Sequence, residues 1–105
     1  KIAGGFTSSG YASGDKVETL HYMATLAAQL RMIWIGTDAP PSNITGDRRD
    51  IDRYGYYIGV GAIGSVRPDA NLPDSGDLLT AELYGARIAT AAARWTGVLV
   101  SSTQA

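Results

Sequence analysis

The sequence predicts an α/β fold in which the strands run parallel. Residues 1–6 and 32–36 are short apolar runs typical of buried strands, and residues 15–30 carry apolar side chains at the helical spacings of three and four. A strand, a helix and a strand in this order imply parallel strands joined by a right-handed crossover. Residues 77–95 predict another helix, so the expected fold has two core strands and two long helices.

The first predicted strand and helix each contain a local signal. Gly4 and Gly5 weaken the strand and indicate a close approach of another backbone. Asp15 and Glu18 have the spacing of a capping box, with aspartate in place of the usual serine or threonine, so the helix is expected to begin there. Its apolar stripe consists of Val17, Leu20, Met23, Ala27 and Leu30.

A long region rich in turn residues separates the second strand from the closing helix. Residues 37–76 contain prolines, glycines and a charged run, and only residues 56–65 within them could be extended. Loops of this length are usually functional or partly disordered. For the closing helix, Ser75 or Asp77 is the expected cap and Gly97 the expected stop.

We expect the 105 residues to form a single partial domain. Residues 1–36 would be the strand–helix–strand unit, 37–76 the loop region, 77–96 the closing helix, and 97–105 a tail of unknown role. The chain opens on Lys1 and enters apolar sequence directly, so we expect it to start inside a longer protein.

Composition argues against several classes of partner. Nine basic and ten acidic residues give a net charge of −1 without an extended basic patch, so we expect no nucleic-acid partner. No apolar run approaches the roughly 20 residues of a membrane span, and no signal-peptide pattern opens the chain. Cysteine is absent, which excludes disulfides and thiolate chemistry within these residues. We therefore expect a cytoplasmic protein with no membrane contact.

The letters of a dinucleotide-binding fingerprint, G-x-G-x-x-G, occur at residues 59–64. The mechanism of that motif needs a helix to begin within it, and residues 65–69 are poor helix material. We therefore interpret the motif as a glycine-rich loop that bends tightly.

Two other patterns also have simpler interpretations than a functional site. Asp47, Asp50 and Asp52 alternate with arginines, which would repel a metal ion, so a solvated charged loop is expected. His21 is the one histidine and lies off the apolar stripe, where an exposed helical histidine is the default and a general base the alternative.

Residues 7–14 give the strongest functional signal. They follow a predicted parallel strand and precede a helix, which is where ligands bind in open α/β sheets. Their backbone amides and hydroxyl groups suit a flat, polar, heteroaromatic edge. An ordinary flexible connection explains the pattern about equally well.

The whole pattern resembles a known family. "KIAGGFTSSGYASGDKVETLHYMATLAAQLRMIWIG" resembles the fourth strand, ligand loop, fourth helix and fifth strand of flavodoxin-like NAD(P)H:quinone oxidoreductases of the WrbA type and of related FMN reductases. "RDIDRYGYYIGVGAIGS" resembles the loop after the fifth strand, and "DLLTAELYGARIATAAARW" resembles the closing helix. The family's loop commonly continues as Gly-Gly-Gln-Glu, where this chain has Ser13-Gly14-Asp15-Lys16.

The resemblance implies a flavodoxin-like parallel sheet with FMN at the carboxyl ends of the strands. The implied chemistry is hydride transfer from NAD(P)H to FMN, followed by reduction of a quinone or a flavin, with no catalytic residue from the protein. Tyr57 would lie near a flavin, either its own subunit's or a neighbouring subunit's. The residues implied to lie along the flavin ring are Thr7, Ser8, Ser9, Gly10, Tyr11 and Gly14.

The resemblance covers only the C-terminal half of such a domain. The first three strands and the FMN phosphate loop have no counterpart here, so the cofactor site is incomplete in this chain. We expect the sheet to be completed by self-association as a homodimer or higher homo-oligomer. A severed domain and a sheet completed by a different polypeptide are the two alternatives. For function, the alternative is a non-catalytic assembly or binding module that retains the scaffold without flavin.

Overall fold

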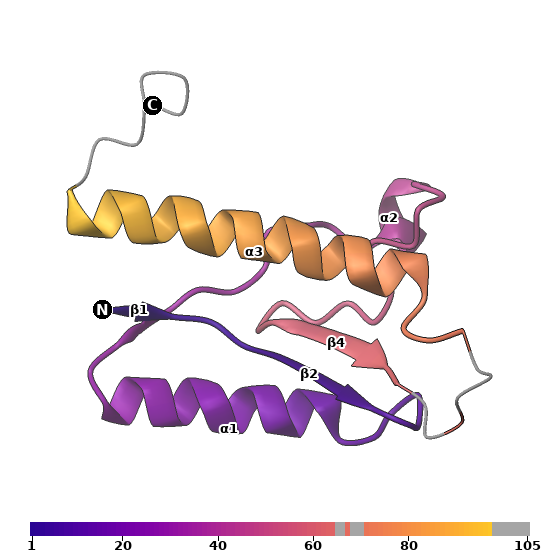
Figure 1. The fold of residues 1–105 in the computed structure, drawn as a ribbon, viewed down its shortest axis with the longest axis horizontal. Coiled ribbons are helices and arrows are strands. Elements are labelled where there is room, and N and C mark those ends of the chain that lie inside the picture. The colour runs from indigo at the N-terminus through magenta and orange to yellow at the C-terminus, as the bar shows by residue number, and fades with distance from the viewer. Residues whose placement is uncertain (65–66, 68–70, 98–105) are drawn as a thin grey trace.

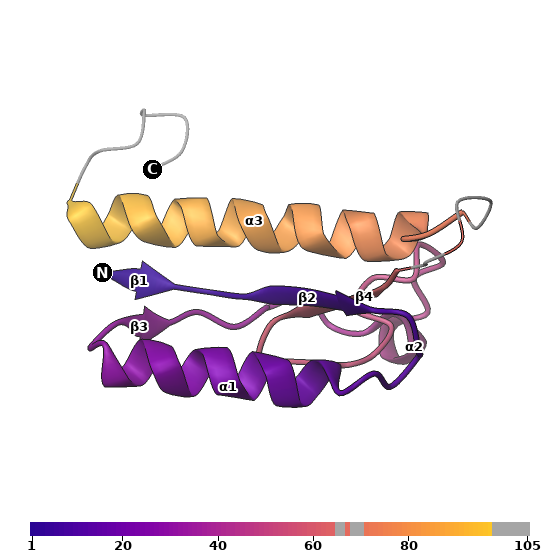
Figure 2. The same cartoon turned by 60° about the horizontal axis from the view of Figure 1, so that its bottom comes forward.

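The computed structural model describes residues 1–64, 67 and 71–97. It is an α/β fold in which α1 (Lys16–Gln29) and α3 (Ser75–Thr96) lie on opposite faces of a layer of strands (Figure 1, Figure 2). The other elements are β1 (Ile2–Ala3), β2 (Phe6–Ser9), β3 (Ile33–Trp34), α2 (Ser42–Thr45) and β4 (Val60–Ile63). The predicted fold class, a partial flavodoxin-like parallel sheet with two long helices, is confirmed.

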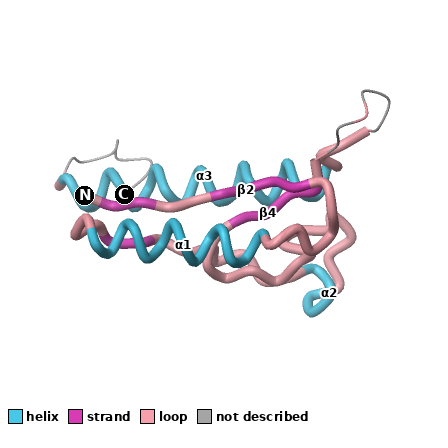
Figure 3. Tube along the Cα trace, turned by 90° about the horizontal axis from the view of Figure 1, so that it is seen from below, coloured by secondary structure: helices cyan, strands magenta, loops and turns pink. Residues whose placement is uncertain are grey.

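Both pairs of strands are parallel, as the strand–helix–strand order predicted. β1 pairs with β3, with Ile2 opposite Ile33, and β2 pairs with β4, with Phe6 opposite Val60. β1 and β2 follow one line (Figure 3), so a single extended segment has two successive partners. Residues 37–59 therefore form an insertion that divides the partner of this segment into β3 and β4.

Tyr84 of α3 bridges the place where the two ladders are interrupted. Its hydroxyl accepts a hydrogen bond from the Gly5 amide at 3.1 Å and donates one to the Ile35 carbonyl, and the residue is buried. A Cβ atom at Gly4 would lie 2.5 Å from that hydroxyl, which explains the glycine at this position. At Gly5 the predicted close approach of a backbone is confirmed, since a Cβ atom at Gly59 would lie 2.5 Å from the Gly5 carbonyl oxygen, and the side chains of Met23 and Trp34 also crowd Gly5.

The boundary predicted between the first strand and the ligand loop is wrong. Thr7, Ser8 and Ser9 lie in β2, opposite residues 61–63 of β4. Their small polar side chains do not prevent this pairing, because backbone groups make the hydrogen bonds between strands. The tight loop predicted at residues 59–64 is also wrong, since Val60–Ile63 is a strand. Extension within residues 56–65, the other interpretation of that stretch, agrees with β4.

Both long helices lie within two residues of their predicted bounds, but their caps differ. Asp15 precedes α1 with a left-handed φ of 54° and makes no capping hydrogen bond with its side chain. The side chain of Asp74, rather than Ser75 or Asp77, caps α3 by accepting a hydrogen bond from an amide of its first turn. Gly97 ends α3 as expected.

No helix among the described residues combines the length and the apolar character that a bilayer span requires. The predicted tail at residues 97–105 lies, apart from its first residue, outside the described residues.

The described residues leave one edge of β1 and β2 without a strand partner. Beside this edge lies an apolar groove of about 560 Å³ between β2 and α3. Phe6, 75% exposed, and Leu78 line it, together with Tyr84 and Ile88. Exposed apolar surface at a free strand edge is typical of a face that another element covers.

Candidate functional site

The connection from β2 to α1 lies at the carboxyl end of the parallel strands (Figure 1). β2 and β4 end side by side, since Ser9 pairs with Ile63, and residues 10–15 then form what we call the β2–α1 turn. Gly14 and Asp15 have positive φ angles of 53° and 54°, which bend the turn sharply. This is the edge at which open α/β sheets bind ligands, so the turn is the candidate site.

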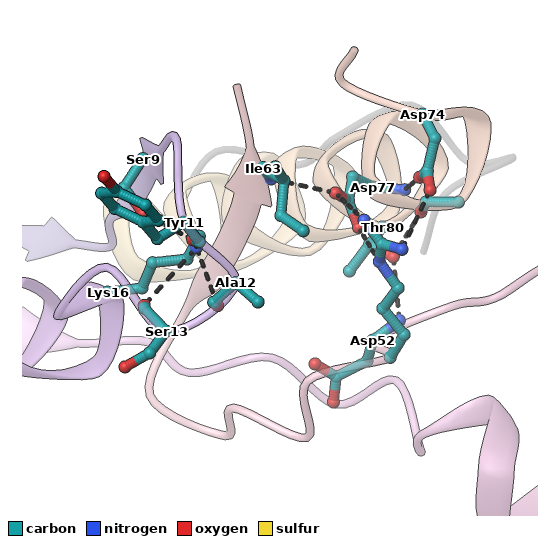
Figure 4. Close-up of polar contacts among 12 residues, drawn as sticks. Ser9, Tyr11, Ala12, Ser13, Lys16, Asp52, Ile63, Asp74, Asp77 and Thr80 are labelled. Carbon is teal, nitrogen blue, oxygen red and sulfur yellow. Dashed lines mark hydrogen bonds and ion pairs between the residues drawn. The ribbon is translucent and has the colours of Figure 1, made fainter. Parts of the chain in front are cut away.

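Lys16 holds this turn from the inside of the protein (Figure 4). Its Nζ donates hydrogen bonds to the carbonyl oxygens of Tyr11, Ala12 and Ser13, at 2.9 Å for Ala12 and 3.5 Å for Ser13. Lys16 is only 1% exposed. Each of the three N–H donors of this buried ammonium has a carbonyl acceptor, and these hydrogen bonds fix the shape of the turn.

Two tyrosines of the insertion pack behind Lys16. Its Nζ lies 5.4 Å from the centroid of the Tyr54 ring, and that ring stacks on Tyr56 with centroids 5.4 Å apart. Burial lowers the pKa of Lys16, while the charge of Asp77 opposes this shift and that of Arg53 adds to it. The insertion is therefore coupled to the turn through its aromatic and charged side chains.

An ion-pair cluster fastens the insertion to the start of α3. The Nε and Nη2 atoms of Arg53 each donate to the Asp77 carboxylate at 2.9 Å, and Nη1 lies 3.0 Å from Asp74. The Asp77 side chain is 2% exposed and also accepts a hydrogen bond from the Ile63 amide at the end of β4. These bonds hold the end of β4, the insertion and α3 in one arrangement.

Asp52 is buried next to this cluster, contrary to the solvated loop predicted from the sequence. Its amide donates to the Thr80 hydroxyl at 2.9 Å and the residue is 4% exposed, while Oδ2 has no partner among the described residues. Burial raises the pKa of the Asp52 carboxyl to about 6, and a hydrogen bond from the Tyr56 amide lowers it in part. Asp47, by contrast, pairs with Arg49 at the surface, as expected.

The structure brings together six of the seven residues predicted to contact a flavin. Thr7, Ser8 and Ser9 form the end of β2, and Gly10, Tyr11 and Gly14 form the turn that follows. Tyr57 lies apart from them, at the base of the insertion. It is 71% exposed, and its carbonyl accepts a hydrogen bond from the Thr37 amide.

Sequence reasoning missed the residues that support the turn. In the sequence, Lys16 stands out only as part of a departure from the family's loop sequence, Arg53 falls in a predicted solvated charged loop, and Asp77 is expected only as a helix cap. A weak signal existed, because Lys16 interrupts the family's usual loop sequence. The inward direction of the Lys16 side chain depends on the insertion, and helical periodicity does not predict where the insertion lies.

Taken together, a parallel sheet with helices on both faces and an exposed turn at its carboxyl edge define a partial flavodoxin-like domain. The chain is 40% identical over 90 residues to flavodoxin FldP of Pseudomonas aeruginosa (strain UCBPP-PA14). The match covers 85% of this chain and 49% of that protein, so the chain spans about half of its length. This similarity supports the flavodoxin family for the chain. No family model matches the chain, and no solved structure matches it.

Proposed function

We propose that this chain supplies the ring-binding part of an FMN site in an NAD(P)H-dependent oxidoreductase that reduces a quinone or a flavin. The main support for this proposal is the β2–α1 turn, which is exposed at the carboxyl end of two parallel strands and held by a buried lysine. The similarity to a flavodoxin over most of the chain supports a flavin ligand. The choice of nicotinamide and of electron acceptor follows only from the resemblance of the sequence to quinone reductases.

The described residues suit the ring of FMN better than its phosphate. A flavin edge consists mostly of hydrogen-bond acceptors, and the turn offers backbone amides together with the hydroxyl of Ser13. When bound, FMN would supply the hydride chemistry, so the task of these residues is to bind and orient it. The resemblance assigns the phosphate to the loop after the family's first strand, whereas the β2–α1 turn corresponds to the loop after its fourth strand, which lies along the ring.

We also propose that another polypeptide unit covers the free edge of β1 and β2, with a second copy of this chain as the first candidate. The apolar groove beside Phe6 and Leu78 supports this, because exposed surface of that kind needs cover. The same groove favours the second candidate function, an assembly module without flavin. The cytoplasmic location expected from the sequence remains part of the proposal.

Flavin binding tests the two functions directly. Wild-type protein is expected to quench FMN fluorescence, and Thr7→Ala combined with Ser8→Ala is expected to weaken binding about tenfold, since each hydroxyl lost costs about 0.5–1.5 kcal/mol. A titration of FMN with each protein measures both affinities.

The matched control removes two hydroxyls far from the turn. Thr25 on α1 and Thr90 on α3 are both exposed, so the pair Thr25→Ala and Thr90→Ala should leave the affinity unchanged. A wild-type protein that leaves FMN fluorescence unaltered would favour the assembly module instead. Equal affinity of wild type and the Thr7/Ser8 variant would remove these two residues from the site.

A further inference from the structure

Lys16 occupies a position on α1 that is unfavourable for a positive charge. Lys16 is the first residue of that helix, where the helix dipole already places positive partial charge, so a cation there is unfavourable. Burial adds a second cost, because an ammonium loses its hydration. Within the described residues no carboxylate lies in ion-pair contact with its Nζ. The three carbonyls of the turn are thus the groups that this charge holds.

These carbonyls determine where the amides of the turn point. In a trans peptide the C=O of one residue is antiparallel to the N–H of the next. Since the carbonyls of residues 11–13 converge on Nζ, the amides of Ala12, Ser13 and Gly14 are directed away from it. Among the described residues none of these three amides donates a hydrogen bond. Ala12 and Ser13 are exposed and Gly14 is half-buried, and the charge of Lys16 lies behind all three amides.

We propose that Lys16 is a positioning residue that aims these amides at an electron-rich ring edge and that its charge favours the anionic form of that ring. This inference rests on the proposed function and names the form of the ligand that the turn prefers. An ammonium close behind three donors stabilises negative charge beyond them, and the burial of Lys16 reduces the screening of its charge by water. A flavin ring gains electron density on reduction, so Lys16 should favour reduced over oxidised FMN.

The test compares three variants with wild type. Lys16→Met removes the charge and all three donors, whereas Lys16→Arg keeps a positive charge and N–H donors on the same side of the turn. Lys1→Met is the matched control, because Lys1 is exposed and its loss changes the net charge equally. Lys16→Gln replaces Lys16→Met if circular dichroism shows that the methionine variant is unfolded.

The first measurement is the rate at which chymotrypsin cleaves after Tyr11, which is 82% exposed within the turn. Lys16→Met is expected to speed this cleavage about tenfold, since the turn loses the group that orders it, whereas cleavage after the exposed Tyr22 within α1 stays unchanged. Lys1→Met should be cleaved like wild type. An unaltered rate of cleavage after Tyr11 in Lys16→Met would overturn the proposal, whether or not flavin binds.

The second measurement is the reduction potential of bound FMN. A charge that favours the reduced ring tenfold shifts a two-electron potential by about 30 mV, so Lys16→Met should lower the potential by about that amount and Lys16→Arg should retain it. A purely structural role would weaken both redox forms equally and leave the potential unchanged, which would overturn the proposal. If wild type binds neither form, the proposed function fails, and the proteolysis result alone decides whether Lys16 positions the turn.

Discussion

Arg53→Met is expected to lower the free energy of unfolding by about 3 kcal/mol, the largest effect of any single change at the site, because it leaves a buried carboxylate without its cation. The Asp77 side chain is 2% exposed and receives two hydrogen bonds from Arg53. Without Arg53 it would keep the Ile63 amide but not the charge that balances it. Urea unfolding at neutral pH, followed by circular dichroism, measures the loss.

Two further variants show whether burial is the reason. Arg49→Met breaks an ion pair with Asp47 in which Arg49 is 64% exposed, so it should cost less than about 1 kcal/mol. Adding Asp77→Asn to Arg53→Met removes the uncompensated charge and should restore part of the stability. Burial would be contradicted as the cause if Arg49→Met and Arg53→Met lowered the free energy of unfolding equally. It would also be contradicted if the double variant were less stable than Arg53→Met alone.

This cluster also shows where sequence reasoning stops. Helical periodicity placed α1 and α3 within two residues, because a buried stripe repeats along the chain and needs no knowledge of its partner. The bonds of Arg53 join residues 24 apart in sequence, and no periodic pattern reports such a contact. The charged run was therefore predicted to be a solvated loop, although its last residue, Arg53, is fastened to the start of α3.

The extended segment of residues 2–9 illustrates the same limit for strands. The apolar run predicted β1, but β2 consists of Phe6 and three small polar residues, and its pairing depends on β4. β4 in turn lies beyond an insertion and begins within a glycine-rich stretch that read as a loop. Strand pairing depends on tertiary contacts, so the sequence predicted a turn at the carboxyl edge of the strands but began it too early.

The sequence predicted where the turn lies but not which residues hold its shape. Glycine and serine residues between a strand and a helix indicate a polar loop, and the carboxyl-end rule places a ligand there. The left-handed conformation of Asp15 breaks the expected capping box, and it is Lys16 that organises the turn. The turn residues thus predict where a ligand would lie, whereas the residue that shapes the site is visible only in three dimensions.

Asp52→Asn is expected to stabilise the protein by about 2–3 kcal/mol at pH 7.5 and to change little at pH 4. Burial raises the pKa of Asp52 from 3.8 to about 6, so the folded protein holds a proton that the unfolded chain releases at lower pH. Stability is therefore lost as the pH rises from about 4 through about 6, at about 1.4 kcal/mol for each unit of pKa difference. Asparagine carries no charge and still accepts the hydrogen bond from the Tyr56 amide, so it avoids this loss.

Asp50→Asn provides a close control, because Asp50 and Asp52 both have positive φ angles, 57° and 48°, which asparagine tolerates well. Asp50 is exposed, so its variant shares any backbone benefit of asparagine without removing a buried charge. The difference between the two variants, measured by urea unfolding from pH 4 to pH 8, isolates the cost of charging Asp52. A difference that stays constant across this range would show that the Asp52 carboxylate reaches water in the folded protein, since only a buried carboxylate makes unfolding depend on pH in this way.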